Sequence, residues 1–304
     1  MVSYNTRELT IQSLRTLIEH TSDVRCEMIV IDNASSDGSA AAIEATYPSV
    51  RLIRLEENVG FAAANNIAAK HACGEKLLLL NPDTITLSGA VRSLLDFSER
   101  RPEAGIWGGR TYQDERLGAL NPGSCWGLPT LWSLLCVTLG LNAIFSDSLL
   151  FNSEHYGRWP RDDEREVGMV SGCFLLISRP LWKRLGGFDT RFFMYFEDTD
   201  LNIRARQLGY RPAITPEATI IHLGGASEPD QAEKLERFFQ SKARLIRRHW
   251  SRGSARIGMA LVILHPLVRS IAYQLASWSN PTRFGGRAHT WRTVWRRRQI
   301  WMNA

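Results

Sequence analysis

Short apolar runs alternate with amphipathic stretches over the first hundred residues of the chain. Runs that predict buried strands cover residues 27–31, 50–55 and 76–80. Apolar residues at helical spacing cover residues 9–18, 40–45 and 62–72. Strands that alternate with helices predict βαβ units, in which a largely parallel sheet carries helices on both faces. The pattern therefore predicts an α/β fold.

Polar side chains follow each of the predicted strands. Asp32 and Asn33 end the first run, Asn58 follows the second, and Asn81-Pro82-Asp83 follows the third. In open α/β sheets, ligands bind beyond the carboxyl ends of the strands. We therefore expect a binding site at this edge.

The pattern is less regular from residue 110 to 165, where Trp, Gly and Pro are frequent. This stretch reads as a long excursion over the sheet. Order returns at Met169–Ile177, an apolar run with Gly172 inside it that predicts another buried strand. A glycine within a strand indicates either the close approach of a ligand or another backbone, or else a bulge or packing contact, and the sequence leaves both readings open.

Composition narrows the class of protein. A chain of 304 residues with 44% hydrophobic residues can bury a large core. Its five cysteines are scattered and form no Cys-x-x-Cys pair, which argues against a zinc site or a disulfide framework and for a reducing compartment. Polar residues follow Met1 almost at once, so we expect no signal peptide.

Charge divides the chain sharply. No Asp or Glu follows Glu236, yet 14 Lys and Arg residues do, whereas the residues up to Glu236 hold 23 basic against 31 acidic side chains. A basic tail on an acidic body indicates an anionic partner, either nucleic acid or anionic lipid.

The tail also contains an apolar run, residues 258–275, which His265, Pro266 and Arg269 interrupt. It looks too short and too broken for a membrane span. Its flanking arginines and tryptophans suit a helix that lies on a membrane, and a helical cap packed on the domain is the alternative.

The segment Phe193–Leu201 brings aromatic side chains directly before three acids, Glu197, Asp198 and Asp200. Acids at a helix N-terminus can serve as caps. Apolar surroundings also raise the proton affinity of a carboxylate, which is how a general base is tuned. The segment is therefore a candidate catalytic site.

Taken together, these motifs resemble the inverting glycosyltransferases of family 2. The resemblance covers residues 2 to about 227, and the motifs occur in the family's order. They are Val2-Ser-Tyr-Asn5, Val30-Ile-Asp-Asn-Ala-Ser-Ser-Asp-Gly-Ser39, Asn58-Val-Gly-Phe-Ala-Ala-Ala-Asn-Asn66, Leu80-Asn-Pro-Asp-Thr84, Val170-Ser-Gly172, Gly186-Gly-Phe-Asp189, Phe196-Glu-Asp-Thr-Asp-Leu201 and Ile221-His222.

The resemblance implies a GT-A fold, with a single Rossmann-like sheet that is mixed but mostly parallel. It places a catalytic domain at residues 1–236, with a nucleotide-binding half at about 1–109 and an acceptor half at about 166–236. Residues 237–304 would form a basic helical tail that associates with a membrane. Relatives have a longer first strand before Ser3, so we expect either a start site set too late or a shortened chain.

The resemblance also implies roles for single residues. The residues expected to bind the nucleotide sugar are Tyr4, Asn5, Asp32, Asn58, Gly60, Asn65, Asn81 and Asp83. Asn81 stands where many relatives have the first acid of an Asp-x-Asp signature, which leaves Asp83 as the main carboxylate for Mg²⁺ or Mn²⁺. His222 is the second expected metal ligand, although a lone histidine after a strand is often only a core residue.

Asp198 matches the family's catalytic base. An inverting transfer needs one carboxylate to remove the acceptor proton and forms no covalent intermediate. We expect Gly172, Glu197 and Asp200 to orient the acceptor, with helix capping as the alternative role for the two acids.

The predicted function is therefore the transfer of a sugar from a nucleotide diphosphate, such as dTDP-rhamnose or a UDP-sugar, to a cell-surface glycan or lipid-linked acceptor. The enzyme would be cytoplasmic and peripheral on the inner face of the membrane. A nucleotidyltransferase is disfavoured because no Gly-rich loop with a phosphate-binding Lys follows the first strand. The remaining alternatives are an inactive nucleotide-binding relative and a protein that binds nucleic acid through its tail, although no nucleic-acid module precedes that tail.

Overall fold

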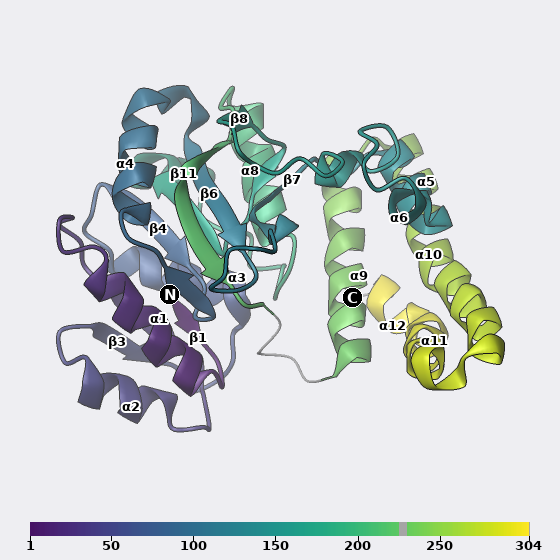
Figure 1. Ribbon diagram of the computed structural model, residues 1–304, viewed down its shortest axis with the longest axis horizontal. Helices are drawn as coiled ribbons and strands as arrows, with labels where there is room; N and C mark the ends of the chain where they lie inside the picture. The colour runs from purple at the N-terminus through teal and green to yellow at the C-terminus, as the bar shows by residue number, and fades with distance from the viewer. Residues whose placement is uncertain (225–229, 304) are drawn as a thin grey trace. The chain divides into compact units, whose positions relative to one another are not determined.

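The computed structural model describes residues 1–224 and 230–303, and the chain divides into two compact units (Figure 1). Unit 1 consists of Met1–Trp126, Pro160–Phe193 and Glu197–Ser227. Unit 2 consists of Gly127–Trp159, Met194–Phe196 and Glu228–Ala304. The excursion in the middle of the sequence thus groups with the C-terminal tail.

Unit 1 begins with a three-stranded parallel sheet in the order β1 (Val2–Ser3), β2 (Ile29–Asp32) and β3 (Arg51–Arg54). Helices α1 (Arg7–Glu19), α2 (Ser39–Thr46) and α3 (Gly60–His71) alternate with these strands. Between the sheet and the helices lie the buried side chains of Leu14, Val30, Ile43 and Val50. These elements follow the apolar pattern to within a few residues.

A second, six-stranded sheet completes unit 1. Its main path runs β4 (Lys76–Leu80), β10 (Phe174–Ser178), β6 (Ile106–Tyr112), β11 (Ala213–His222) and β5 (Thr84–Thr86), while β8 (Arg165–Glu166) pairs with β11. Helix α4 (Ala90–Arg100) packs on this sheet through Leu94 and Phe97. The α/β class with a mixed sheet flanked by helices is as predicted. The prediction was a single, mostly parallel sheet. These strands instead form two separate hydrogen-bonded sheets, and the six-stranded sheet is mainly antiparallel because β10 runs against both β4 and β6.

The run Met169–Ile177 is not one continuous strand. It divides into β9 (Met169–Val170), which pairs with β7 (Cys125–Trp126), and β10. Residues 171–173 separate the two strands, and Gly172 lies in this break. Helices α7 (Arg179–Leu185) and α8 (Glu197–Gln207) follow, and α8 begins with the acidic cluster.

Unit 2 is helical. It contains α5 (Leu131–Leu139), α6 (Leu141–Ile144), α9 (Gln231–His249), α10 (Arg252–Ser279), α11 (Pro281–Arg296) and α12 (Arg298–Asn303) (Figure 1). Its core brings Leu134 of α5 together with tail residues, namely Phe239, Ile246, Val262, Val294 and Trp301. The excursion and the tail therefore share one hydrophobic core.

Helix α10 runs unbroken for 28 residues, although the sequence predicted an interrupted run. Pro266 lies within the helix on its buried face, beside Val262 and Ser270. By length and composition alone, α10 is long and apolar enough to cross a membrane, and 22% of its most apolar window is buried. A helix with these properties is weak grounds for a span, because core helices can share them.

Candidate active site

The first side of the site joins the end of β2 to the start of α3. Asn33 Nδ2 donates to Asn58 Oδ1 at 2.8 Å, and the backbone N–H of Val59 donates to Asn33 Oδ1 at 3.0 Å. Asn58 Oδ1 also accepts from the N–H of Gly60. The two asparagines therefore brace each other and the turn before α3.

Gly60 must be glycine for two reasons. Its φ is +83°, in the left-handed region, and a Cβ there would lie 2.5 Å from the carbonyl oxygen of Phe193. The next residue, Phe61, donates its N–H to that same carbonyl at 2.8 Å. The start of α3 is thus fixed against the segment that precedes the acidic cluster.

Asp32 and Asn5 lie at the carboxyl ends of neighbouring strands, as predicted. Asn5 Oδ1 accepts from the N–H of Ser36 at 2.8 Å, and the N–H of Asn5 donates to Ser35 Oγ at 3.0 Å. Asp32 Oδ2 accepts from the N–H of Ser35, while the buried Asp32 Oδ1 has no hydrogen-bond partner within the described residues. An acceptor without a partner at a strand end suits a ligand that donates hydrogen bonds. Tyr4, half-buried, follows β1 directly.

A second group lies where β5 pairs with the end of β11. Thr84 faces His222 in the antiparallel ladder, which brings Asp83 Oδ1 to 3.2 Å from His222 Nε2. Asn81 Nδ2 lies 3.3 Å from the same nitrogen. The structure therefore brings together the two expected metal ligands, Asp83 and His222, and places Asn81 beside them, although Asn81 and His222 are 141 residues apart in the sequence.

These side chains fit a divalent cation in part. Asp83 is an oxygen ligand, His222 a nitrogen ligand, and the buried Asn81 Oδ1 has no hydrogen-bond partner among the described residues. In the described part of the chain, no cluster of three or more His, Cys, Asp or Glu side chains is placed to hold a metal. Any cation here would need further ligands, such as the oxygens of a diphosphate.

The pKa of His222 is raised above its ordinary value, which favours the imidazole that carries a second proton. Burial would lower its pKa, but its neighbours Cys173 and Asp83 outweigh burial and raise the pKa to about 10. A cation that binds His222 must displace this proton, because a metal ligand needs a neutral imidazole.

Asp198 stands at the start of α8, opposite the break between β9 and β10. Its Oδ2 accepts from the N–H of Gly172 at 3.1 Å, and its Oδ1 accepts from the N–H of Thr199 at 2.7 Å. A Cβ at Gly172 would lie 3.4 Å from the ring of Phe61 and 3.9 Å from Asp198 Cβ. Both distances are ordinary van der Waals contacts, so Gly172 packs beside the side chains of Phe61 and Asp198, and no close approach of a backbone there requires glycine.

The same break links Asp198 to the candidate metal ligands. The carbonyl of Cys173 accepts from the backbone N–H of Asn81 at 3.1 Å, while the adjacent Gly172 holds Asp198. Two consecutive residues therefore connect the predicted base to the Asn81–Asp83 turn.

Burial tunes the carboxyls of Asp198 and its neighbour Glu197. Desolvation raises the pKa of Asp198, partly offset by its hydrogen bonds from Gly172 and Thr199. Desolvation, and then the charge of Asp198, raises the pKa of Glu197 well above its usual range. Glu197 Oε2 is buried and has no hydrogen-bond partner in the described chain, and no Lys or Arg there pairs with Asp198. The titrations of the two carboxyls are therefore linked, because the charge of Asp198 raises the pKa of Glu197. Asp198 is the partly exposed member of the pair.

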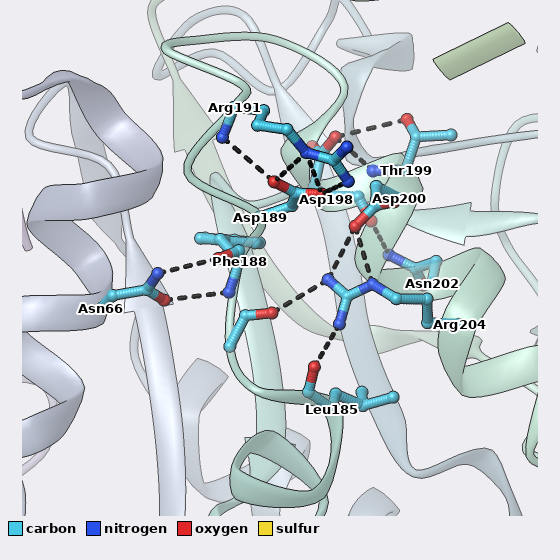
Figure 2. Close-up of polar contacts among 11 residues, drawn as sticks. Asn66, Leu185, Phe188, Asp189, Arg191, Asp198, Thr199, Asp200, Asn202 and Arg204 are labelled. Carbon is cyan, nitrogen blue, oxygen red and sulfur yellow. Dashed lines mark hydrogen bonds and ion pairs between the residues drawn. The ribbon is translucent and has the colours of Figure 1, made fainter. Parts of the chain in front are cut away.

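Asp200 differs from its two neighbours because a cation neutralises it. It is fully buried and pairs with Arg204, one helical turn away, at 2.7 Å (Figure 2). The Arg204 guanidinium also donates to the carbonyls of Leu185 and Gly187 at 2.5 and 2.9 Å (Figure 2). Removing one partner of such a buried pair typically costs about 3–5 kcal/mol. Asp200 thus holds the 185–187 turn against α8, which is a structural role.

Other asparagines serve as braces. Asn65 Nδ2 donates to the carbonyl of Phe61 within its own helix, at 2.9 Å. Asn66 forms two hydrogen bonds with the backbone of Phe188, at 2.8 and 2.9 Å (Figure 2). The sequence interpretation assigned no role to Arg204, Asn33 or Asn66. For Arg204, the sequence did contain a signal, because an acid and an arginine four residues apart on a helix can form an ion pair.

The fold resembles that of solved glycosyltransferases. A mannosyltransferase from Pyrobaculum calidifontis, solved in complex with GDP-Man and Mn²⁺, aligns with a TM-score of 0.56 and 17% identity, over 96% of this chain and 83% of that one. GalNAc-T7, solved with UDP, GalNAc and Mn²⁺, aligns with a TM-score of 0.59 and 14% identity, over 83% of this chain and 47% of that one. These likenesses define the class, a GT-A fold.

The sequence then gives the family. Residues 1–185 match the model of glycosyl transferase family 2, and the chain belongs to that family. The predicted class of enzyme, a glycosyltransferase, is thereby confirmed.

Two curated relatives are informative. One is the N-acetylglucosaminyl-diphospho-decaprenol L-rhamnosyltransferase of Mycobacterium tuberculosis, to which the chain is 29% identical over 219 residues. This alignment covers 64% of this chain and 66% of the relative. The chain is 26% identical over 224 residues to the O-antigen biosynthesis protein RfbC of Myxococcus xanthus, over 70% of this chain but 16% of that protein. The chain thus spans just under two thirds of the first relative.

Proposed function

We propose that this chain transfers a sugar, with inversion, from a nucleotide diphosphate to a lipid-linked glycan acceptor. The observation that carries the proposal is the partly exposed Asp198 carboxylate. It is held by the Gly172 N–H, has a raised pKa, and is tied through Cys173 to the Asn81–Asp83 turn. A carboxylate with raised pKa and no cationic partner is suited to accept a proton near neutral pH.

In the proposed reaction, the acceptor hydroxyl attacks the anomeric carbon from the face opposite the diphosphate. The new carbon–oxygen bond forms as the bond to the diphosphate breaks, and Asp198 takes the acceptor proton. Glu197, whose high pKa favours its neutral form, adds no second negative charge beside the base. We propose that Asp200 contributes only by fixing α8 through Arg204.

The donor would lie along the strand ends, with its base near Tyr4, Asn5 and the unpartnered Asp32 Oδ1. Asn58, Gly60 and Asn65 would shape this side of the site through the backbone that they brace. Asp83 and His222, with Asn81 Oδ1, would hold a divalent cation, which when bound neutralises charge on the departing diphosphate. Two fold neighbours hold Mn²⁺, which supports a divalent cation in general.

For the donor sugar we favour rhamnose from dTDP-rhamnose over a hexose from a UDP-sugar. The support is the relative whose printed name is an L-rhamnosyltransferase. That name also supports a lipid-linked acceptor. We further propose that the basic tail holds the enzyme on the anionic inner face of a membrane.

A donor panel tests this proposal. Purified protein should hydrolyse one nucleotide sugar slowly in the presence of Mg²⁺ or Mn²⁺, and dTDP-rhamnose should be the preferred donor. The chelated protein and Asp198→Asn are the two controls. No donor-dependent release of nucleotide from any panel member, with tight nucleotide binding intact, would instead support an inactive relative.

A further inference from the structure

Exposed apolar side chains concentrate on unit 2. Among the large hydrophobic side chains that are exposed in the described chain, twelve of fifteen belong to unit 2. Five of them lie within twelve residues at the end of α5 and just beyond it, namely Leu139, Ile144, Phe145, Leu149 and Leu150. Contiguous exposed apolar surface marks a site of interaction.

The 139–150 segment is held in place rather than loosely looped. Trp132 Nε1 donates to the carbonyl of Leu150 at 2.8 Å, and Asn152 Nδ2 donates to that of Ser146 at 2.7 Å. The rings of Phe145 and Phe151 pack at 4.9 Å. Leu149 and Leu150 nevertheless remain 65% and 60% exposed. A segment that is fixed by hydrogen bonds and still exposes its leucines is suited to contact an apolar partner.

The sequence before and through most of this segment is free of charged residues. No Asp, Glu, Lys or Arg occurs between Arg116 and Asp147. Asp147 itself is exposed and pairs with Arg158 at 2.9 Å. This ion pair limits how deeply the segment can enter an apolar phase, because it must stay among polar groups.

Helix α10, which packs against α5 (Figure 1), has an apolar exposed face of its own. Its exposed large side chains recur at helical spacing, at Ile257, Leu264, Ile271, Leu275 and Trp278. The opposite face, from Gly258 to Ser270, is buried.

Two polar side chains in the middle of α10, His265 and Arg269, make contacts within unit 2. Arg269, its one charged residue between Arg256 and Arg283, donates to the carbonyl of Val137 in α5 at 3.0 Å. His265 stacks on Trp291 at 5.3 Å, and burial, followed by the charges of Lys242 and Arg269, lowers its pKa to about 3. Beyond Arg256, the exposed face of α10 therefore carries no charge at neutral pH.

We propose that the 139–150 segment is a second membrane-contacting element, which enters the lipid beside the exposed face of α10. Exposed arginines flank α10 at both ends, at Arg252, Arg256, Arg283 and Arg287, and no acid occurs in the tail after Glu236. This arrangement complements anionic headgroups around an apolar insertion. Because one face of α10 is buried within unit 2, the helix lies in the interface and does not cross the bilayer.

This inference rests on the proposed lipid-linked acceptor, and it adds the excursion to the surface that would meet the membrane. The 139–150 segment would make binding partly independent of charge. Vesicle binding should therefore keep a salt-resistant component that the arginines alone would not give.

A fluorescent label tests the segment directly in the full chain. Cys26 and Cys73 are the exposed native cysteines, so Cys26→Ser/Cys73→Ser gives the background. An environment-sensitive dye is then placed by Leu149→Cys, with Leu117→Cys in unit 1 as the matched control. With phosphatidylcholine–phosphatidylglycerol vesicles, the dye at 149 should shift to the blue and be quenched by acyl-chain spin labels. The dye at 117 should do neither.

A substitution pair gives the second measurement. Leu149→Asp/Leu150→Asp should lower vesicle partitioning at high salt by at least about tenfold, since each buried leucine contributes strongly to transfer from water. Leu117→Asp/Leu208→Asp is the control, and thermal melting checks that each variant folds. Turnover with a water-soluble acceptor should be unchanged, so that failure here is distinguishable from failure of the proposed function.

Two outcomes would overturn the inference. One is a dye at 149 that stays insensitive while the protein binds vesicles. The other is a blue shift without vesicles that grows with protein concentration, because a second copy of the chain would then cover the segment.

Discussion

The two units of this chain differ in which side chains they bury and which they expose. Unit 1 buries several carboxyl groups, namely Asp32, Asp83, Glu197 and Asp200, and exposes few large apolar side chains. Unit 2 exposes apolar side chains and, in the tail, carries arginine and lysine without a single acid. Burial raises the pKa of Glu197 and of its neighbour Asp198, which suits a carboxyl for proton transfer, whereas exposing leucine and tryptophan suits a surface for lipid.

The comparison predicts that chemistry and attachment can be lost separately. Substitutions in unit 1 should change turnover and leave vesicle binding intact. Substitutions in unit 2 should do the reverse, as long as the acceptor supplied is soluble in water.

The largest effect is expected for Asp198→Asn. The amide keeps the shape of the carboxylate but cannot accept the proton, so kcat should fall by at least about a hundredfold. Calorimetry should show unchanged donor binding, and vesicle binding should also be unchanged. Asp96→Asn, on the exposed face of α4, is the control. Turnover close to that of the wild type would remove Asp198 from the mechanism.

Asp83→Ala comes next. Loss of the carboxylate beside His222 should weaken metal-dependent nucleotide binding by at least about tenfold. Chelation should weaken wild-type binding to a similar extent and have no further effect on the variant. Tight nucleotide binding that ignores both chelator and substitution would show that no cation takes part.

Neutralising arginines tests the other side of the comparison. Arg252→Gln/Arg256→Gln should lower affinity for anionic vesicles at low salt by about fivefold per residue, because each contributes about 1 kcal/mol. Lys183→Gln/Arg184→Gln in unit 1 is the control of equal charge. These substitutions are preferable to deleting the tail, because Leu134 packs with Phe239 and Val262 and would lose its core. Equal binding by both pairs would argue against the tail as the attachment site.

The smallest effect concerns stability and pH. The pKa of Glu197 is raised in the folded protein, so the folded state binds more protons than the unfolded state between the ordinary and the raised pKa. The unfolding free energy therefore falls as pH rises through that window, with a limiting slope of about 1.4 kcal/mol for each pH unit. Glu197→Gln should remove the part of this slope that comes from Glu197, leaving that of Asp198, and be more stable than the wild type at pH above the window. Urea denaturation at mildly acidic and mildly alkaline pH measures it, and an equal pH dependence of the two proteins would contradict it.

The sequence predicted the first half of unit 1 well. Local patterns alone decide such elements, and β4 begins and ends as the apolar run 76–80 predicted. The apolar pattern wrongly predicted one continuous strand at Met169–Ile177. Periodicity does not reveal that the strand is interrupted at residues 171–173, where the Gly172 N–H donates to Asp198. Unit 2 was harder to predict because its elements bury one another across the chain. Only the structure shows that the 127–159 excursion packs with the tail.

The sequence predicted that certain site residues would lie close together, but not the contacts that support them. Asp83 and His222 meet as predicted, since strand pairing brings them together. Asp200 was expected to orient the acceptor or cap a helix, and the structure buries it against Arg204. An ion pair with a carbonyl-binding guanidinium depends on the 185–187 turn, which residue types do not reveal.

Gly60 constrains how this protein could diverge. Most positions along the strand ends carry side chains that could be substituted one at a time. Such substitutions could gradually change which donor the site binds. Position 60 offers none, because the carbonyl of Phe193 occupies the volume of a Cβ and the backbone has positive φ. In a library that randomises the site, this position should return glycine alone, while its neighbours drift.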